Sequence, residues 1–248
     1  MKYFFSILFF AFNLFSFEET IKKEFSSKGI EKVLVENVNG DIEIYGDDGK
    51  QILIEAIKKA DKERNLKNLN VKIFRKEKTL NIKTEHTRSY FLGFLPVKMG
   101  GSVKYKISLP SGMNLKIETV NGSILIEKVD GLIEAESVNG DLNLKEVFGK
   151  GKFETVNGSI KIKIKDEFPN FNAESVNGDI YIKSLKKINA NYSIEVVNGK
   201  IKIIPEIMEI KSSTTKEITG KWGDGRGKVD IETVNGNVTI EIEEEKFI

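Results

Sequence analysis

The chain has 248 residues, of which 40% are hydrophobic and 31% are charged, so it is long enough to bury a real core. Its 39 Lys and Arg residues nearly balance 37 Asp and Glu residues, and a formal charge of +2 provides no basic field for nucleic acid. With no cysteine and a single histidine, His86, disulfides, thiol nucleophiles and multi-histidine metal sites are excluded.

Residues 1–16 read MKYFFSILFFAFNLFS, one lysine followed by an almost unbroken apolar run. The run is short for a membrane-spanning helix, and Glu18 and Glu19 follow it closely. We therefore expect a cleaved export signal, with a buried first strand or an uncleaved anchor as alternatives. The expected destination is the periplasm, the cell surface or the medium.

Residues 17–46 lead into the first of seven copies of the tripeptide Val-Asn-Gly. From Gly122 onward the copies follow at steps of 18, 18, 20, 21 and 37 residues, and the degenerate copy Ile218-Thr219-Gly220 divides the last step. After each copy, apolar and polar residues alternate, which is typical of a strand with one buried face. The asparagines of the seven copies are Asn39, Asn121, Asn139, Asn157, Asn177, Asn198 and Asn235.

This spacing predicts an all-β fold, a parallel β-solenoid whose successive coils stack about 4.8 Å apart. Isoleucine and leucine columns would fill the interior, and the asparagine column would pair amide to amide. We expect about eight short coils of about three faces each, wound as a right-handed β-helix. An antiparallel meander or propeller is disfavoured, because the period is far below the roughly 40 residues of a propeller blade.

Residues 47–112 interrupt the repeats and contain four strand-like runs, Gln51–Ile57, Leu69–Arg75, Thr79–Thr84 and Ser102–Leu109. We expect an inserted antiparallel β-sheet that caps the open end of the stack, because uncovered strand edges invite aggregation. Lys59–Asn68 is expected to be a short helix or a loop. The apolar segment Tyr90–Val97 would pack onto this sheet or contact a partner. Residues 113–248 would form the remaining solenoid repeats.

A glutamate precedes each Val-Asn-Gly copy by two residues and the degenerate copy by one, which predicts a column of stacked carboxylates. Three explanations for its stability remain open: neighbouring columns such as Lys145, Lys163 and Lys183 offset the charge, cations bind, or backbone N–H groups at the Asn-Gly corner hold the carboxylates. We favour a structural column that hydrogen-bonds the corners, with no metal and no cofactor. Its members are Glu36, Glu118, Glu136, Glu154, Glu174, Glu195, Glu217 and Glu232.

Some β-solenoids cleave polysaccharides, so the residues that follow each glycine bear on catalysis. Asp141 and Asp179 would lie about 9.6 Å apart, too far for the roughly 5.5 Å of a retaining glycosidase and marginal for an inverting one. We expect these side chains to cap turns. No nucleophile elbow, metalloprotease motif or phosphate-binding loop is present, so we predict no catalytic residue.

The repeated unit Glu-[Thr/Ser]-Val-Asn-Gly-[Asp/Ser]-Ile-x-Ile resembles the DUF4097 family of bacterial proteins, which are often labelled adhesins. The Leu-Pro-Ser-Gly stretch at Leu109–Gly112 is similar to that family too, and the resemblance covers roughly residues 31–243. It implies a β-helical fold on an exported or membrane-associated protein and brings no defined catalytic residues.

The sequence favours a non-enzymatic, adhesin-like solenoid that presents a rigid surface to a protein or polysaccharide of the cell envelope or of the extracellular space. Lys161, Lys202 and Tyr181 are the candidate outward residues. Two alternatives remain: a carbohydrate-active β-helix enzyme, and an envelope scaffold that self-associates end to end.

Overall fold

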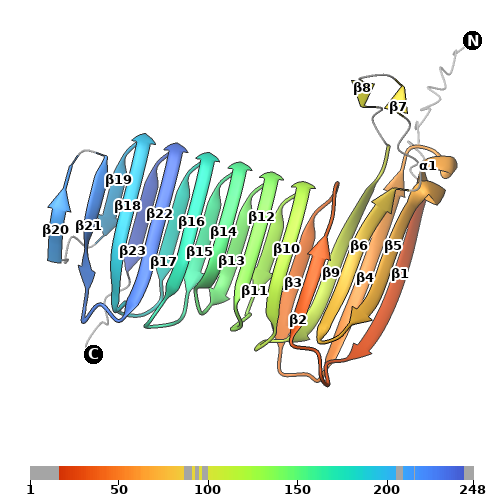
Figure 1. Ribbon diagram of the computed structural model, residues 1–248, viewed down its shortest axis with the longest axis horizontal. Coiled ribbons are helices and arrows are strands. Elements are labelled where there is room, and N and C mark those ends of the chain that lie inside the picture. The colour runs from red at the N-terminus through yellow and green to blue at the C-terminus, as the bar shows by residue number, and fades with distance from the viewer. Residues whose placement is uncertain are drawn as a thin grey trace, which may run out of the picture.

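The computed structural model describes residues 17–86, 91–92, 95–96, 100–204, 209–214 and 216–242. Within these ranges the protein consists of two large, facing, mostly parallel β-sheets, a two-stranded antiparallel pair, and one short helix, α1 (Glu63–Asn68) (Figure 1). The prediction of an all-β fold is confirmed. No helix among the described residues is long and apolar enough to cross a membrane. The expected export signal, residues 1–16, lies outside the described residues.

The two large sheets are named here sheet A and sheet B. Sheet A has ten strands, in spatial order β1 (Phe17–Ser26), β4 (Gln51–Ala60), β9 (Ser102–Pro110), β3 (Ile42–Asp47), β11 (Ile124–Glu127), β13 (Leu142–Val147), β15 (Ile160–Ile164), β17 (Ile180–Ser184), β23 (Val238–Ile242) and β19 (Ile201–Ile204). Sheet B has eleven, in order β20 (Glu209–Ser213), β21 (Glu217–Trp222), β18 (Ala190–Asn198), β22 (Gly227–Asn235), β16 (Asn170–Asn177), β14 (Lys150–Asn157), β12 (Ile133–Asn139), β10 (Asn114–Asn121), β2 (Lys32–Glu36), β6 (Thr79–His86) and β5 (Leu69–Lys76).

Each repeat contributes one strand to sheet B and, after the Asn-Gly corner, one strand to sheet A. Equivalent residues of neighbouring repeats face each other, so that Ile117 pairs with Ala135 and Ile124 pairs with Leu142. A repeat therefore has two faces, and the prediction of about three is wrong. The physical reason is length: a sheet B strand, a sheet A strand and two tight turns use all of the 18 residues.

The last two repeats are exchanged in space relative to their order in the chain. Strand β22 pairs in parallel with β16 on one side and with β18 on the other, so the final repeat is inserted before the one that precedes it in sequence. Figure 1 shows β22 between β16 and β18. The degenerate copy Ile218-Thr219-Gly220 lies on β21, which pairs antiparallel with β18. The expectation that this copy forms another parallel coil is therefore wrong.

The N-terminal region extends both sheets at the other end of the stack. All four strand-like runs of the insertion are strands: β4 and β9 join sheet A, and β5 and β6 join sheet B. The β4–β9 and β5–β6 pairs are antiparallel, whereas β9 and β6 pair in parallel with the first repeat. The predicted short helix is α1. In Tyr90–Val97 only the backbone pairing of β7 (Phe91–Leu92) with β8 (Leu95–Pro96) is described, so its predicted packing lies outside the described residues.

The core lies between the two sheets as one continuous cluster that spans the N-terminal region and the stack. Alternate residues of each strand enter it, as the period of two requires, and on β15 these are Ile160, Ile162 and Ile164. The largest fully buried side chains are Tyr105 in the N-terminal region and Phe153 in the stack. The remaining residues of each strand form two flat outer faces, one on each sheet.

Candidate functional site

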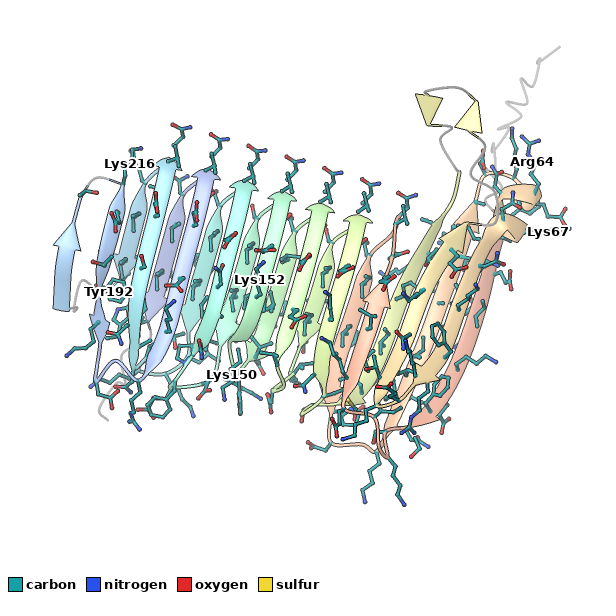
Figure 2. All side chains as sticks on the ribbon, in the orientation of Figure 1. Arg64, Lys67, Lys150, Lys152, Tyr192 and Lys216 are labelled. Carbon is teal, nitrogen blue, oxygen red and sulfur yellow. The ribbon has the colours of Figure 1, made fainter. Side chains whose placement is uncertain are left out.

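The Asn-Gly corners lie in a single row along one edge of the stack. Each asparagine after the first donates a side-chain hydrogen bond to the amide oxygen of the asparagine before it in the row, at 2.8–2.9 Å. The order of the row is Asn39, Asn121, Asn139, Asn157, Asn177, Asn235 and Asn198. Figure 2 shows similar side chains repeated at the arrowheads of successive strands. The row holds the corners in register and leaves few amide groups free for a ligand.

A second row beside the asparagines consists of buried hydroxyl groups. Ser137, Thr155 and Ser175 each donate to the carbonyl of the glycine in the preceding repeat, at 2.9–3.1 Å. In the first repeat Asn37 occupies this position, and its amide donates to the carbonyls of Gly40 and Val103. Sequence analysis identified the Thr/Ser position but assigned it no role. Its recurrence in the repeated unit was the available signal.

Most of the polar residues that follow the corner glycines cap the backbone of the next strand. The Asp141 carboxylate accepts a hydrogen bond from the Ser159 N–H at 2.7 Å, and the Asp179 carboxylate accepts one from the Asn237 N–H at 2.7 Å. Both carboxylates are thus engaged by backbone donors, as expected for turn capping. Their position gives no support to an acid–base pair across one glycosidic bond.

The predicted glutamate column lies on the outer face of sheet B, where register pairs place each glutamate beside the next. Along the stack the order is Glu36, Glu118, Glu136, Glu154, Glu174, Glu232 and Glu195, and Glu217 follows on the antiparallel strand β21. Their Cα atoms are therefore separated by about one interstrand step, 4.8 Å. This set is named here the acidic row.

Part of the acidic row is balanced by lysines of its own sheet. Lys116 pairs with Glu118 at 2.8 Å and Lys152 with Glu154 at 2.5 Å, in each case from two residues earlier on the same strand. Figure 2 labels Lys152 half-way along β14. The pKa of Lys152 is raised, because its ammonium donates a hydrogen bond to Glu154 and because Glu136 and Glu174 add negative charge nearby.

Two of the explanations offered for the acidic row are therefore wrong. The carboxylates do not hold the Asn-Gly corners, because Asn amides and Ser/Thr hydroxyls already do so. Lys145, Lys163 and Lys183 do not offset them, because these residues lie on sheet A, on the other side of the core. The described residues contain no group of three or more acidic or histidine side chains placed to hold a metal ion.

A groove of about 640 Å³ follows the acidic row across sheet B. One wall is the acidic row from Glu36 to Glu232, and the other is formed by the valines of six Val-Asn-Gly copies. Among these valines, Val120, Val138 and Val156 are 40–41% exposed. Neighbouring copies repeat the same pair of side chains, so the groove offers one carboxylate and one apolar group per strand. We name it the sheet B groove.

The outward residues predicted from the sequence come together on the opposite sheet. Lys161 on β15, Tyr181 on β17 and Lys202 on β19 lie in one row across sheet A, with Thr239 of β23 between Tyr181 and Lys202. They line a hollow of about 720 Å³ near the C-terminal end of the stack. Lys200 also lines this hollow, a residue that sequence reasoning did not single out.

Comparisons with known proteins agree with this architecture. Residues 133–241 match the family model described as Toastrack DUF4097. A search of curated proteins finds no match. A crystal structure from Clostridium sporogenes, described as a putative cell adhesion protein, superposes with a TM-score of 0.55 at 14% identity, covering 91% of this chain and 100% of that one. At this identity the similarity shows the fold alone.

Two further solved structures superpose more loosely. One is described as a putative adhesin from Bacteroides fragilis, with a TM-score of 0.36 at 11% identity, covering 91% of this chain and 97% of that one. The other is described as a putative lipid binding protein from Parabacteroides distasonis, with a TM-score of 0.34 at 14% identity, covering 92% and 97%. The resemblance of the repeated unit to the DUF4097 (Toastrack) family is confirmed by this match, which covers residues 133–241.

Proposed function

We propose that this protein is a non-enzymatic, exported, adhesin-like binding protein whose rigid lateral surface holds a protein or polysaccharide of the cell envelope or of the extracellular space. The observation that carries the proposal is the sheet B groove. It crosses several strands and presents the same carboxylate and the same exposed valine on each of them. A surface of this kind fits an extended partner that meets repeated, equivalent contacts.

Rigidity is the second support for a binding role. Three hydrogen bonds join neighbouring corners, as in the repeat of Asn157. The Gly140 N–H donates to the Asn157 carbonyl, the Asn157 side-chain amide donates to the Asn139 side chain, and the Thr155 hydroxyl donates to the Gly140 carbonyl. A partner bound along such a surface loses little free energy to ordering of the protein, because the surface is already ordered. Catalysis has no comparable support, since Asp141 and Asp179 cap backbone N–H groups.

The proposal also includes export of the protein and a right-handed winding of the coils. Residues 1–16 act as a removable signal, which N-terminal sequencing of the mature protein and fractionation of the producing cells will test. The coils wind right-handed, because a strand that returns to its own sheet in parallel does so with right-handed connections in nearly all proteins.

The groove is tested by retention of the purified protein on envelope fractions of the producing cells. A Val138→Asp/Val156→Asp variant places two more carboxylates along an already acidic groove, and both valines are exposed, so the fold tolerates the change. We expect retention to fall by roughly tenfold or more, because two apolar contacts are lost and two charges must be desolvated.

Leu132→Asp is the matched control, since Leu132 is 48% exposed and does not line the groove. This variant should bind like the wild type. The proposal fails if no envelope fraction retains the wild-type protein, or if the double variant and the control are retained equally.

A further inference from the structure

The hollow on sheet A, named here the basic hollow, is lined by three lysines. Lys161, Lys200 and Lys202 line it, and none of the three side chains forms an ion pair within the described part of the chain. Two lysines elsewhere on the same sheet do form ion pairs, Lys104 with Glu43 at 2.5 Å and Lys22 with Glu55 at 3.0 Å. Three unpaired ammonium groups around one depression favour an anionic ligand.

The two carboxylates that border the basic hollow are already engaged. Asp179 accepts hydrogen bonds from the Asn237 backbone N–H at 2.7 Å and from its side-chain amide at 3.2 Å. The carboxylate of Glu241, on the neighbouring strand, accepts a hydrogen bond from the Tyr181 hydroxyl at 2.5 Å. Because both carboxylates are held by these hydrogen bonds, Lys161, Lys200 and Lys202 are the charged side chains at this surface that have no ion-pair partner among the described residues.

The arrangement across the strands is linear. Lys161, Tyr181, Thr239 and Lys202 occupy successive strands in one register row, so the Cα atoms of the two lysines are about 14 Å apart, with the phenol ring between them. The hydrogen bond to Glu241 fixes the ring. A chain that crosses the strands therefore meets a cation, an aromatic ring, a hydroxyl group and a second cation in turn.

We propose that the basic hollow binds a polysaccharide made of acidic sugars. The ammonium groups match carboxylates spaced along the sugar chain, the Tyr181 ring offers an apolar face to a pyranose ring, and Thr239 and Asn237 supply polar partners for sugar hydroxyls. The volume of about 720 Å³ lies within the roughly 300–1,000 Å³ of ligand sites.

Other anionic chains fit the basic hollow less well. A polyphosphate would use the lysines but neither the ring nor the hydroxyl group. An extended peptide would pair with the backbone of the edge strand β19, whereas the row of lysines, ring and hydroxyl group stands on the face of the sheet. The basic hollow is on the opposite sheet from the sheet B groove, so its test does not depend on the groove or on the partner held there.

The test is binding of polygalacturonate oligomers to the full-length mature protein by isothermal titration calorimetry. Lys161→Ala/Lys202→Ala should weaken binding by roughly tenfold or more, because two charge-assisted contacts are lost. Lys28→Ala/Lys76→Ala removes the same charge from exposed positions at the far end of the protein and should leave affinity unchanged. Binding of neutral dextran oligomers as tight as that of polygalacturonate, or equal affinity for both double variants, overturns the proposal.

A second variant separates sugar recognition from simple charge attraction. Tyr181→Ser removes the ring, and it should weaken binding of polygalacturonate severalfold while leaving any binding of inorganic polyphosphate unchanged. Polyphosphate that binds as tightly as polygalacturonate, with no effect of Tyr181→Ser on either ligand, overturns the assignment to acidic sugars. Circular dichroism of each variant verifies the fold, and retention on envelope fractions through the sheet B groove reports separately on the proposed function.

Discussion

The stack of Val-Asn-Gly repeats and the N-terminal region share one core, yet their strands are held together in different ways. In the stack, identical residues of neighbouring repeats bond to one another, as Asn157 does with Asn139 and with Asn177. In the N-terminal region, unlike residues form individual pairs, such as Lys58 with Glu19 and Thr84 with Tyr105. A row of identical bonds requires every corner to be alike, whereas individual pairs tolerate change one at a time.

The comparison predicts the largest loss of stability at a glycine corner of the stack. A Cβ atom on Gly158 would lie 2.2 Å from the carbonyl oxygen of Gly140, a backbone atom that cannot move without displacing the next repeat. We expect Gly158→Ala to lower the free energy of unfolding by more than about 4 kcal/mol, measured by urea denaturation.

The control for this change is Gly112→Ala, where a Cβ would meet nothing within 4 Å. This variant should stay within about 1 kcal/mol of the wild type, on the stabilising side. Equal losses in the two variants would contradict the close packing of the corners.

The next largest effect belongs to the N-terminal region and depends on pH. Burial raises the pKa of Tyr105 to about 12, against which its hydrogen bond with Thr84 acts only partly. The neutral phenol is therefore favoured in the fold: its contribution is complete below the unfolded pKa of about 10 and is lost as the pH rises through about 12. The loss amounts to about 2–3 kcal/mol.

Tyr105→Phe tests this sign directly. At pH 8 the variant should be about 1 kcal/mol less stable than the wild type, because the bond to Thr84 is lost. Between pH 10 and 12 the two stability curves should cross, because only the wild type carries the titrating phenol. Urea denaturation at several pH values measures both curves, and curves that remain parallel would refute the prediction.

A smaller effect is expected for the asparagine row. Asn157→Ala removes two amide hydrogen bonds, one to Asn139 and one from Asn177, and should cost about 1–2 kcal/mol. Asn198, at the end of the row, makes only the bond to Asn235 in this row, so Asn198→Ala should cost about half as much. Thermal or urea unfolding of the two variants measures both losses. Equal losses of stability in Asn157→Ala and Asn198→Ala would contradict the prediction that the loss follows the number of hydrogen bonds removed.

The smallest effect is expected for an exposed ion pair of the N-terminal region. Lys72 and Glu85 join β5 to β6 at 2.6 Å, and both side chains are about half exposed. A double-mutant cycle with alanine at both positions should give a coupling energy below about 1 kcal/mol that falls further at high salt. A larger, salt-independent value would mean that individual pairs hold this region as firmly as the rows hold the stack.

Much of the fold was predictable because equivalent residues of neighbouring repeats pair with each other, so the repeated sequence specifies the register of the strands. Alternation around Ile160 and Ile162 identified the buried face, and the recurrence of Val-Asn-Gly predicted parallel neighbours. The four strands of the insertion were recognised from composition. The candidate surfaces were predicted less well: Lys161, Tyr181 and Lys202 were selected as outward residues, but their common hollow depends on which strand lies beside which.

The sequence by itself determined the repeating unit, the side of each strand that faces the core, and the residues that recur at every corner. Only the tertiary structure decided that a repeat has two faces, that lysines of sheet B pair with part of the acidic row, and that β22 lies between β16 and β18. The reason is that nearly identical repeats offer nearly identical edges. Local patterning therefore specifies register, whereas the choice among equivalent neighbours depends on how the connecting segments and the hairpin partner β21 fit around the stack.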